Sequence, residues 1–121
     1  MKYMMRLGLR VAATIGVSML LGSSQALATF YAGTGTVAAI VTNDSTWGAD
    51  QDYFVLAGVT SLGTCPTQGG MVVFRLKDDA KGQRQFAVIL ATKVSGSQVT
   101  ADVDDAFKDS QGYCYLRHLT Q

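Results

Sequence analysis

Apolar and polar residues alternate in several short segments of the chain, a pattern that predicts β-strands. Val72, Phe74 and Leu76 share one face of such a segment. Arg75 and Lys77 lie on its other face, which predicts a sheet with one side in solvent. From alternation or from short β-branched and aromatic runs, strands are predicted over residues 36–42, 53–56, 71–77, 99–104 and 113–119.

The segment before Gly96 has a different period, because its apolar side chains recur at spacings of three and four residues. This predicts a short helix over residues 83–94 with one buried face. Gly96 lies where a left-handed helix terminator belongs. A strand over residues 86–90 is the alternative, since this run is apolar and partly β-branched, but the glycine stop signal favours the helix. The apolar stripe consists of Phe86, Ile89, Leu90 and Val94.

The predicted elements follow one another as three strands, a helix and two strands. This is the order of the OB-fold, a small five-stranded, partly open barrel. We therefore expect an all-β domain of OB type with one short helix, although other small β-rich folds share the order. Gly33 and Gly35 are expected in a flexible lead-in, and polar loops are predicted over residues 43–52, 61–70 and 105–112.

Residues 1–28 have the pattern of a cleavable signal peptide. Three basic residues precede an uncharged apolar run, and a small-x-small motif ends at Ala28. The apolar run of about 11 residues is much shorter than the roughly 20 that span a bilayer. We predict cleavage between Ala28 and Thr29, a periplasmic or secreted location, and a single mature domain, residues 29–121, that makes no membrane contact.

Removal of the signal peptide changes the charge of the chain. Three of the ten basic residues lie in it, so seven basic residues accompany nine acidic ones in the mature domain, and every acid is an aspartate. A mildly acidic domain does not attract nucleic acid or an anionic membrane surface. Nucleic acid is therefore not expected as a partner, and nothing in the sequence predicts a cofactor.

Cys65 and Cys114 are the two cysteines, and such a pair in an exported chain predicts one disulfide. The bond closes a loop of about 50 residues and stabilises the domain by on the order of 4 kcal/mol in the chain-entropy model. Cys114 also lies close before His118, at a spacing that a zinc site uses. The two cysteines are more simply explained by each other, so no metal site is predicted.

No motif in the sequence predicts an enzyme. His118 is the only histidine, expected at the surface or at a strand end, and no Gly-x-Ser-x-Gly elbow is present. The densest carboxylate cluster begins like a calcium loop, but Ala106 and Phe107 fill the positions where a ligand and a glycine belong. The members of this cluster, expected on a solvated strand edge and turn, are Asp102, Asp104, Asp105 and Asp109.

Trp47 lies in a polar loop where folding does not require an aromatic residue. An aromatic ring bordered by polar side chains is typical of a sugar site, because the ring covers the apolar face of the sugar and the polar groups bind its hydroxyls. OB-folds also bind ligands through their inter-strand loops. The alternative is that Trp47 caps the barrel as part of the core. The candidate ligand-binding residues are Asn43, Asp44, Ser45, Thr46 and Trp47.

Tyr113, Tyr115 and Arg117 share one face of the last predicted strand. Aromatic residues and arginine are enriched at protein interfaces, so these three form a candidate interface. Cross-strand packing explains the pattern equally well. Aromatics on an OB-fold also stack single-stranded bases, but the charge balance and the export signal argue against that use.

Three segments resemble small exported bacterial proteins with OB-folds, including the binding subunits of A–B toxins of the subtilase-cytotoxin and pertussis-like kind. They are residues 37–42, the pair Tyr53-Phe54 and residues 87–99. Val55 departs from the toxin subunits, which commonly carry a cysteine at this position. The resemblance implies an OB barrel that self-associates into a ring, and it carries over no sugar-binding residue.

These patterns together predict an exported, non-enzymatic binding module with a protein or glycan ligand, and the resemblance implies a homo-oligomer. The alternative is a periplasmic inhibitor or accessory protein that binds another exported protein one-to-one. A small exported enzyme is the third hypothesis, with His118 and Asp104 as the residues to replace in its test.

Overall fold

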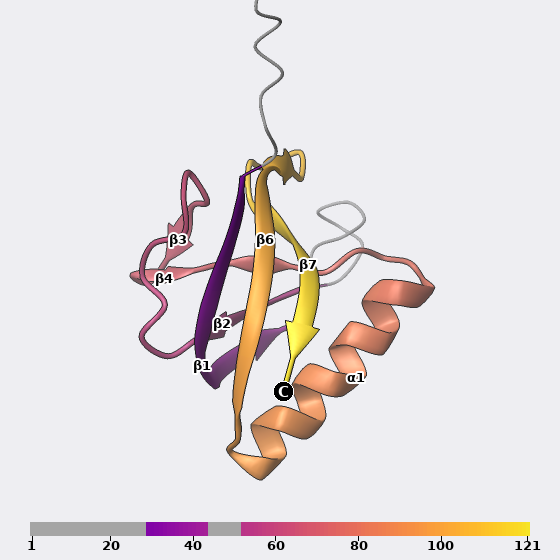
Figure 1. Cartoon of the computed structure of the whole chain (residues 1–121). Coiled ribbons are helices and arrows are strands. Elements are labelled where there is room, and N and C mark those ends of the chain that lie inside the picture. Colours follow the sequence, from indigo (N-terminus) through magenta and orange to yellow (C-terminus); the bar gives the residue numbers. More distant parts are fainter. Residues whose placement is uncertain (1–28, 44–51) are drawn as a thin grey trace, which may run out of the picture.

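The computed structural model describes residues 29–43 and 52–121. The predicted signal peptide, residues 1–28, lies outside the described residues. Within the described ranges the chain forms one helix, a main sheet and a small hairpin (Figure 1). The elements are β1 (Phe30–Val41), β2 (Tyr53–Leu56), β3 (Thr67–Gln68), β4 (Met71–Val72), β5 (Phe74–Arg75), α1 (Ala80–Ser95), β6 (Gln98–Lys108) and β7 (Cys114–Thr120).

The main sheet runs in the order β1-β2-β5-β7-β6, and β6 pairs with β1 again, so each of these strands has two neighbours. The pairing of β5 with β7 is parallel, and the others are antiparallel. β1 serves two partners, because residues 30–36 pair with β6 and residues 37–41 pair with β2. The prediction of a β-rich domain with one helix is therefore confirmed.

β1 begins earlier than predicted. The expectation of a flexible lead-in is wrong, because Gly33 and Gly35 lie inside β1, opposite Ala101 and Val99 of β6. Gly35 permits a close approach of two backbones: a Cβ at this position would lie 2.4 Å from the carbonyl oxygen of Ala57. Because Gly35 has no side chain, β1 can pack directly against the turn that follows β2.

The strand predicted over residues 71–77 is divided in two. β4 forms a hairpin with β3, whereas β5 pairs with β2. Val73 lies between the two strands, and its N–H donates to the carbonyl oxygen of Pro66 at 3.2 Å. The alternation predicts Arg75 in solvent, and this prediction is wrong: Arg75 is 2% exposed because it forms an ion pair with Asp109 inside the fold.

α1 extends the predicted helix at both ends, and the alternative of a strand over residues 86–90 is wrong. Asp79 caps the start of α1, where its side chain accepts the N–H of Gly82 at 2.7 Å. Gly96 ends the helix in the left-handed conformation with a φ of 69°, which confirms the predicted terminator.

The buried face of α1 differs from the predicted stripe. Ile89 is buried, but Leu90 and Val94 are exposed. Gly82 brings the start of the helix close to the segment before it, since a Cβ at this position would lie 1.7 Å from the carbonyl oxygen of Lys77. Gly82 therefore forms part of the inward face of α1. A pattern of apolar side chains does not reveal this, because glycine has no side chain.

β6 continues to Lys108, so it takes up the first half of the turn predicted over residues 105–112. Its register with β7 shifts on both sides of Val103. As a result Val103 and Asp104 are both buried, although neighbours in a regular strand face opposite sides. The irregularity turns the Asp104 carboxylate inward, and the prediction that Asp104 is solvated is wrong.

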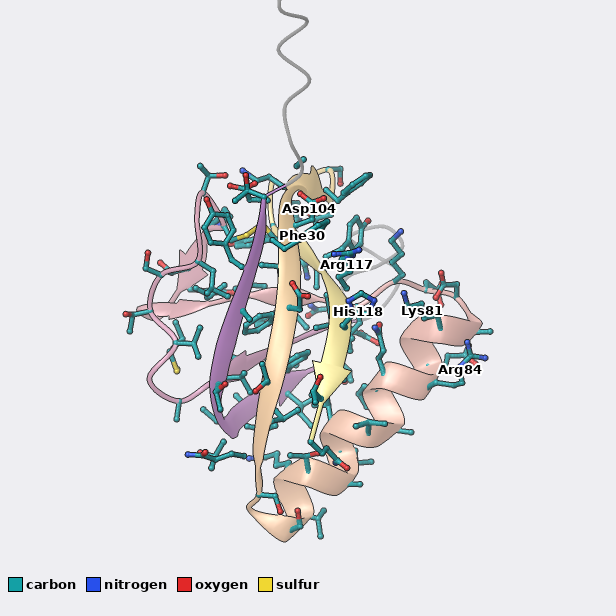
Figure 2. The ribbon with its side chains drawn as sticks, viewed as in Figure 1. Phe30, Lys81, Arg84, Asp104, Arg117 and His118 are labelled. Atoms are coloured by element: carbon teal, nitrogen blue, oxygen red, sulfur yellow. A yellow bond between two sulfur atoms is a disulfide. The ribbon has the colours of Figure 1, made fainter. Side chains whose placement is uncertain are left out.

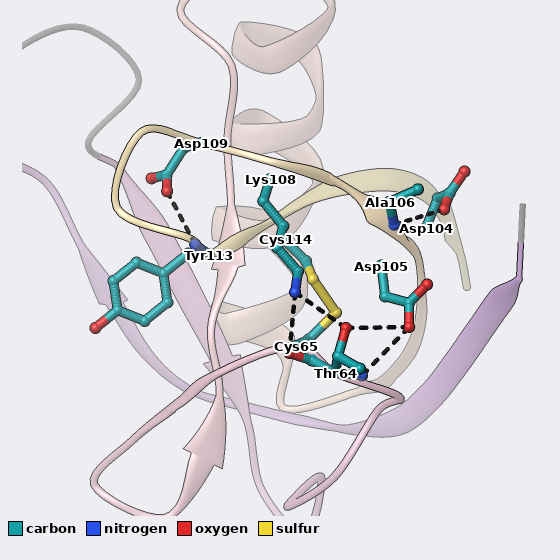
Figure 3. The surroundings of a disulfide bond; sticks show 9 residues. All are labelled: Thr64, Cys65, Asp104, Asp105, Ala106, Lys108, Asp109, Tyr113 and Cys114. Carbon is teal, nitrogen blue, oxygen red and sulfur yellow. Dashed lines mark hydrogen bonds between the residues drawn. A yellow bond between two sulfur atoms is a disulfide. The ribbon is translucent and has the colours of Figure 1, made fainter. Parts of the chain in front are cut away.

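The core is filled by side chains from the main sheet, from the loop after β2 and from α1. Phe54 and Phe74 stack with ring centroids 4.9 Å apart. Cys65 and Cys114 form the predicted disulfide, which joins the loop after β2 to the start of β7 (Figure 3). The other buried members of the core are Val37, Leu56, Val59, Leu62, Val72, Leu76, Ile89, Val99, Ala101, Val103 and Leu116.

Candidate functional site

A cleft of about 250 Å³ lies between the first turn of α1 and the strand β7. Figure 2 labels two of its residues, Lys81 at the start of α1 and Arg117 on β7. The lining combines cationic, aromatic and carboxylate side chains from α1, β6, β7 and the segment before α1. Its residues are Lys77, Asp79, Lys81, Gln85, Asp104, Phe107, Tyr115, Leu116 and Arg117.

Three cations line this cleft. The Lys77 ammonium lies 5.1 Å from the centre of the Tyr115 ring. The Arg117 guanidinium lies 3.7 Å from the centre of the Phe30 ring, a cation–π contact between β7 and β1, the two strands that flank β6. Within the described residues, the ion pairs are formed by other basic side chains, so no carboxylate there lies within ion-pair distance of Lys77, Lys81 or Arg117.

The two carboxylates of the cleft already accept backbone hydrogen bonds. Asp79 accepts the N–H of Gly82 as the cap of α1. Asp104 is 3% exposed, and its Oδ1 accepts the N–H of Ala106 at 2.9 Å (Figure 3). Both therefore stabilise the local backbone, and the three cations remain the charged groups that are open to a ligand.

Aromatic rings form the apolar part of the cleft. Phe107 is 64% exposed near the end of β6, and Tyr115 is half-buried on β7. Phe30, which stacks on Arg117, is also exposed. Exposed aromatic side chains beside arginine are typical of binding surfaces.

Arg75 organises the turn between β6 and β7. Its Nε donates to Asp109 Oδ2 at 2.6 Å, and Nη2 donates to Gln111 Oε1 at 3.0 Å. The guanidinium also lies 5.4 Å from the ring centre of Tyr53 and 4.9 Å from that of Tyr113. Asp109 is buried in this ion pair, so its predicted place on a solvated turn is wrong.

The three residues of the candidate interface on the last strand do not lie together: one packs against Arg75, and the other two line the cleft. Tyr113 packs against Arg75, and its N–H donates to Asp109 Oδ1 at 2.9 Å. Tyr115 and Arg117 instead line the cleft. Each of the three side chains makes a cation–π contact within the chain, so cross-strand packing accounts for part of their pattern.

The candidate sugar site lies almost wholly outside the described residues. Asn43 is described, and its N–H donates to Asp52 Oδ1 at 3.0 Å across the base of the loop. The remaining members, Asp44, Ser45, Thr46 and Trp47, belong to residues 44–51, which are not described. The sugar site therefore stays a prediction.

His118 lies on the surface of β7, as predicted, with a side chain that is 57% exposed. Its Nδ1 lies 3.5 Å from Asp102 Oδ2. Cys114 is bonded to Cys65, so the alternative of a zinc site with His118 is wrong. Among the described residues, no three His, Cys, Asp or Glu side chains form a group that holds a metal ion.

The sequence patterns missed the cleft because its residues come from three separate parts of the chain. The sequence patterns treat Phe107 only as a break in a calcium loop and Lys77 only as a solvent-facing strand position, and they predict nothing for Lys81. The one available signal is that both lysines shortly precede the predicted start of the helix at residue 83.

Comparison with protein-family models, with curated proteins and with solved structures found no match to this chain. The described part of the chain contains no helix long and apolar enough to cross a membrane. The assignment of a function therefore rests on the geometry of the cleft and on the sequence pattern.

Proposed function

We propose that residues 29–121 form an exported, non-enzymatic binding domain with a barrel of OB type. The strand order, the single parallel pair β5–β7 and the place of α1 between β5 and β6 support this fold type. The signal-peptide pattern of residues 1–28 supports export. The disulfide is typical of proteins in oxidising compartments and supports the same location.

The cleft between α1 and β7 carries the proposal of a binding function. It offers cations and exposed aromatic rings in one concave site, a combination that holds ligands in many proteins. Its described lining includes no serine, cysteine or histidine, so it offers no Ser–His or Cys–His nucleophile–base pair. The ligand is a protein segment or a glycan, and the resemblance to toxin binding subunits implies a ring of identical chains.

The alternative is a periplasmic inhibitor or accessory protein that binds one exported protein in a one-to-one complex. The half-buried aromatic and arginine side chains of β7 favour this alternative, because such residues dominate many protein interfaces. The two proposals use the same cleft and differ in the ligand and in the number of chains in the complex.

Binding by the secreted protein to a glycan array and to exported proteins of its host tests this function. The sample is the chain processed in a secreting bacterium, with its start at Thr29 checked by mass spectrometry. We expect Phe107→Ala to lower the affinity for the captured ligand by about tenfold or more, since it removes an exposed aromatic contact. Val94→Ala is the matched control, because Val94 is an exposed apolar residue outside the cleft.

A ligand that binds wild type and Phe107→Ala equally would contradict the proposed site, and no binding in either screen would contradict the binding function. A glycan signal supports the leading proposal. One stoichiometric protein partner without a glycan signal supports the inhibitor or accessory protein. Light scattering on the same samples distinguishes a ring from a monomer.

A further inference from the structure

The charges of the cleft indicate what kind of ligand it takes. Lys77, Lys81 and Arg117 bring three positive charges into the lining, and Asp79 and Asp104 bring two negative ones. The lining therefore has an excess of one positive charge. A ligand with one negative charge neutralises this excess, whereas a doubly charged ligand leaves an unpaired charge in a partly closed site.

The three cations are available to such a ligand. Lys77 and Arg117 contact aromatic rings, and neither side chain forms a hydrogen bond or ion pair with another described residue. The side chain of Lys81 makes no hydrogen bond or ion pair with any other described residue. It lies in the first turn of α1, where backbone N–H groups add to the positive potential.

The apolar residues and the volume of the cleft limit the chemical character and the size of the rest of the ligand. Phe107, Tyr115 and Leu116 offer an aromatic and aliphatic surface next to the cations. The volume of about 250 Å³ falls below the range of roughly 300–1,000 Å³ that is usual for sites of drug-sized molecules. The cleft therefore fits one ring or one amino-acid residue and not an extended oligomer.

We infer that this cleft binds an organic carboxylate with a short apolar or aromatic body, held by Lys77, Lys81 and Arg117 with its body on Phe107 and Tyr115. This inference rests on the proposed function, because it assigns the ligand chemistry of the same cleft. The carboxylate comes from a free small acid or from the C-terminal residue of a peptide.

A titration followed by amide NMR on the secreted protein tests the charge requirement. The probes are N-acetyl-phenylalanine and its uncharged amide, which differ only in the carboxylate. We expect the acid to bind about tenfold more tightly than the amide, because a charge-assisted hydrogen bond is roughly twice as strong as a neutral one, and an extra ~1.4 kcal/mol is tenfold in affinity. The largest shifts are expected at Lys81, Tyr115 and Arg117.

Two variants locate the carboxylate contact. Lys81→Gln and Arg117→Gln should each remove most of the preference for the acid over the amide. Lys93→Gln is the control, because it removes the same charge from the far end of α1, outside the lining. Loss of the preference in all three variants would indicate a general charge effect and would overturn the assignment.

Further probes separate the sources and the charges of the ligand. A pentapeptide that ends in Phe with a free carboxylate, compared with N-acetyl-phenylalanine, shows whether a peptide terminus or a free acid binds more tightly. Phenyl phosphate should bind no more tightly than the carboxylate, and a tenfold tighter phosphate would overturn the inference. Acid and amide binding equally in the cleft would also overturn it, while the binding function would stand.

Discussion

At the scale of single residues, Arg75 is the most consequential side chain that the alternation of polar and apolar positions misplaces. It is buried, paired with Asp109 and flanked by the rings of Tyr53 and Tyr113. A buried ion pair contributes little net stability against an apolar replacement, but a lone buried charge costs much more. The pair therefore makes the position of the β6–β7 turn dependent on both partners.

Asp109→Ala should lower the free energy of unfolding by about 3–5 kcal/mol, because it leaves the Arg75 guanidinium buried without its carboxylate. Urea denaturation of the secreted protein measures this loss. The double variant Arg75→Met/Asp109→Ala should recover a large part of it, since neither charge remains. A single variant as stable as wild type, or a double variant no better than the single, would contradict this account.

The sequence predicts some residues well and others poorly for identifiable reasons. Cys65 and Cys114 are paired as predicted, because in a chain with two cysteines each has only one possible partner. Arg75 and Asp104 are buried against prediction, because an ion pair and a shifted register make burial tolerable for a charge. Both causes involve distant parts of the chain, which a local pattern does not contain.

At the scale of elements, α1 shows that the position of a helix and the choice of its buried face have different causes. Its existence and its end at Gly96 follow from local signals, and both are confirmed. The face that it buries depends on the contact between Gly82 and the backbone of Lys77. That contact also places Lys81 beside the cleft, so the start of the helix affects both stability and the site.

Gly82→Ala should destabilise the domain by about 1–3 kcal/mol, because the new Cβ would overlap the Lys77 carbonyl group. Helix propensity alone predicts the opposite sign, a gain of about 1 kcal/mol. Thermal unfolding followed by circular dichroism decides between them. Gln83→Ala is the control at the next, exposed position and should change stability by no more than about 0.5 kcal/mol. A raised melting temperature for Gly82→Ala would show that the backbone around Lys77 shifts to accommodate the new Cβ, and would contradict this prediction.

The strands differ in how much of them the sequence predicts. β2 has the predicted bounds, because its apolar run is short and ends in a turn at Gly58. The strand over residues 71–77 is predicted as one element and is divided in two, since its halves pair with different neighbours. The order of elements was thus accessible from the sequence, but the pairing partners were not.

At the scale of the whole molecule, the disulfide joins two parts of the fold that are far apart in the sequence. Cys65 and Cys114 are separated by 49 residues, and both are buried. Beside the bond, Lys108 Nζ and the Asp105 carboxylate bind Thr64 Oγ1 (Figure 3). The loop after β2 is therefore fixed to β6 and β7 by a covalent bond and by polar contacts.

Replacing both cysteines by alanine should lower the free energy of unfolding by about 2–5 kcal/mol, since the bond restricts the unfolded chain. Guanidinium denaturation of the variant and of the oxidised and reduced wild type measures the effect. The reduced wild type should unfold at nearly the same midpoint as the variant. An unchanged midpoint in both would mean that the polar contacts suffice without the bond.

The joint between β5 and β7 rests on one pair of residues, Arg75 and Tyr115. Lys77 follows β5 on one side of this joint, and Arg117 lies further along β7 on the other. A ligand held by both cations spans this joint and links the segment after β5 to β7 for as long as it is bound. A ligand that binds only the folded form stabilises it more as the free ligand concentration rises above the Kd, so the resistance of this domain to opening would rise and fall with the ligand's supply.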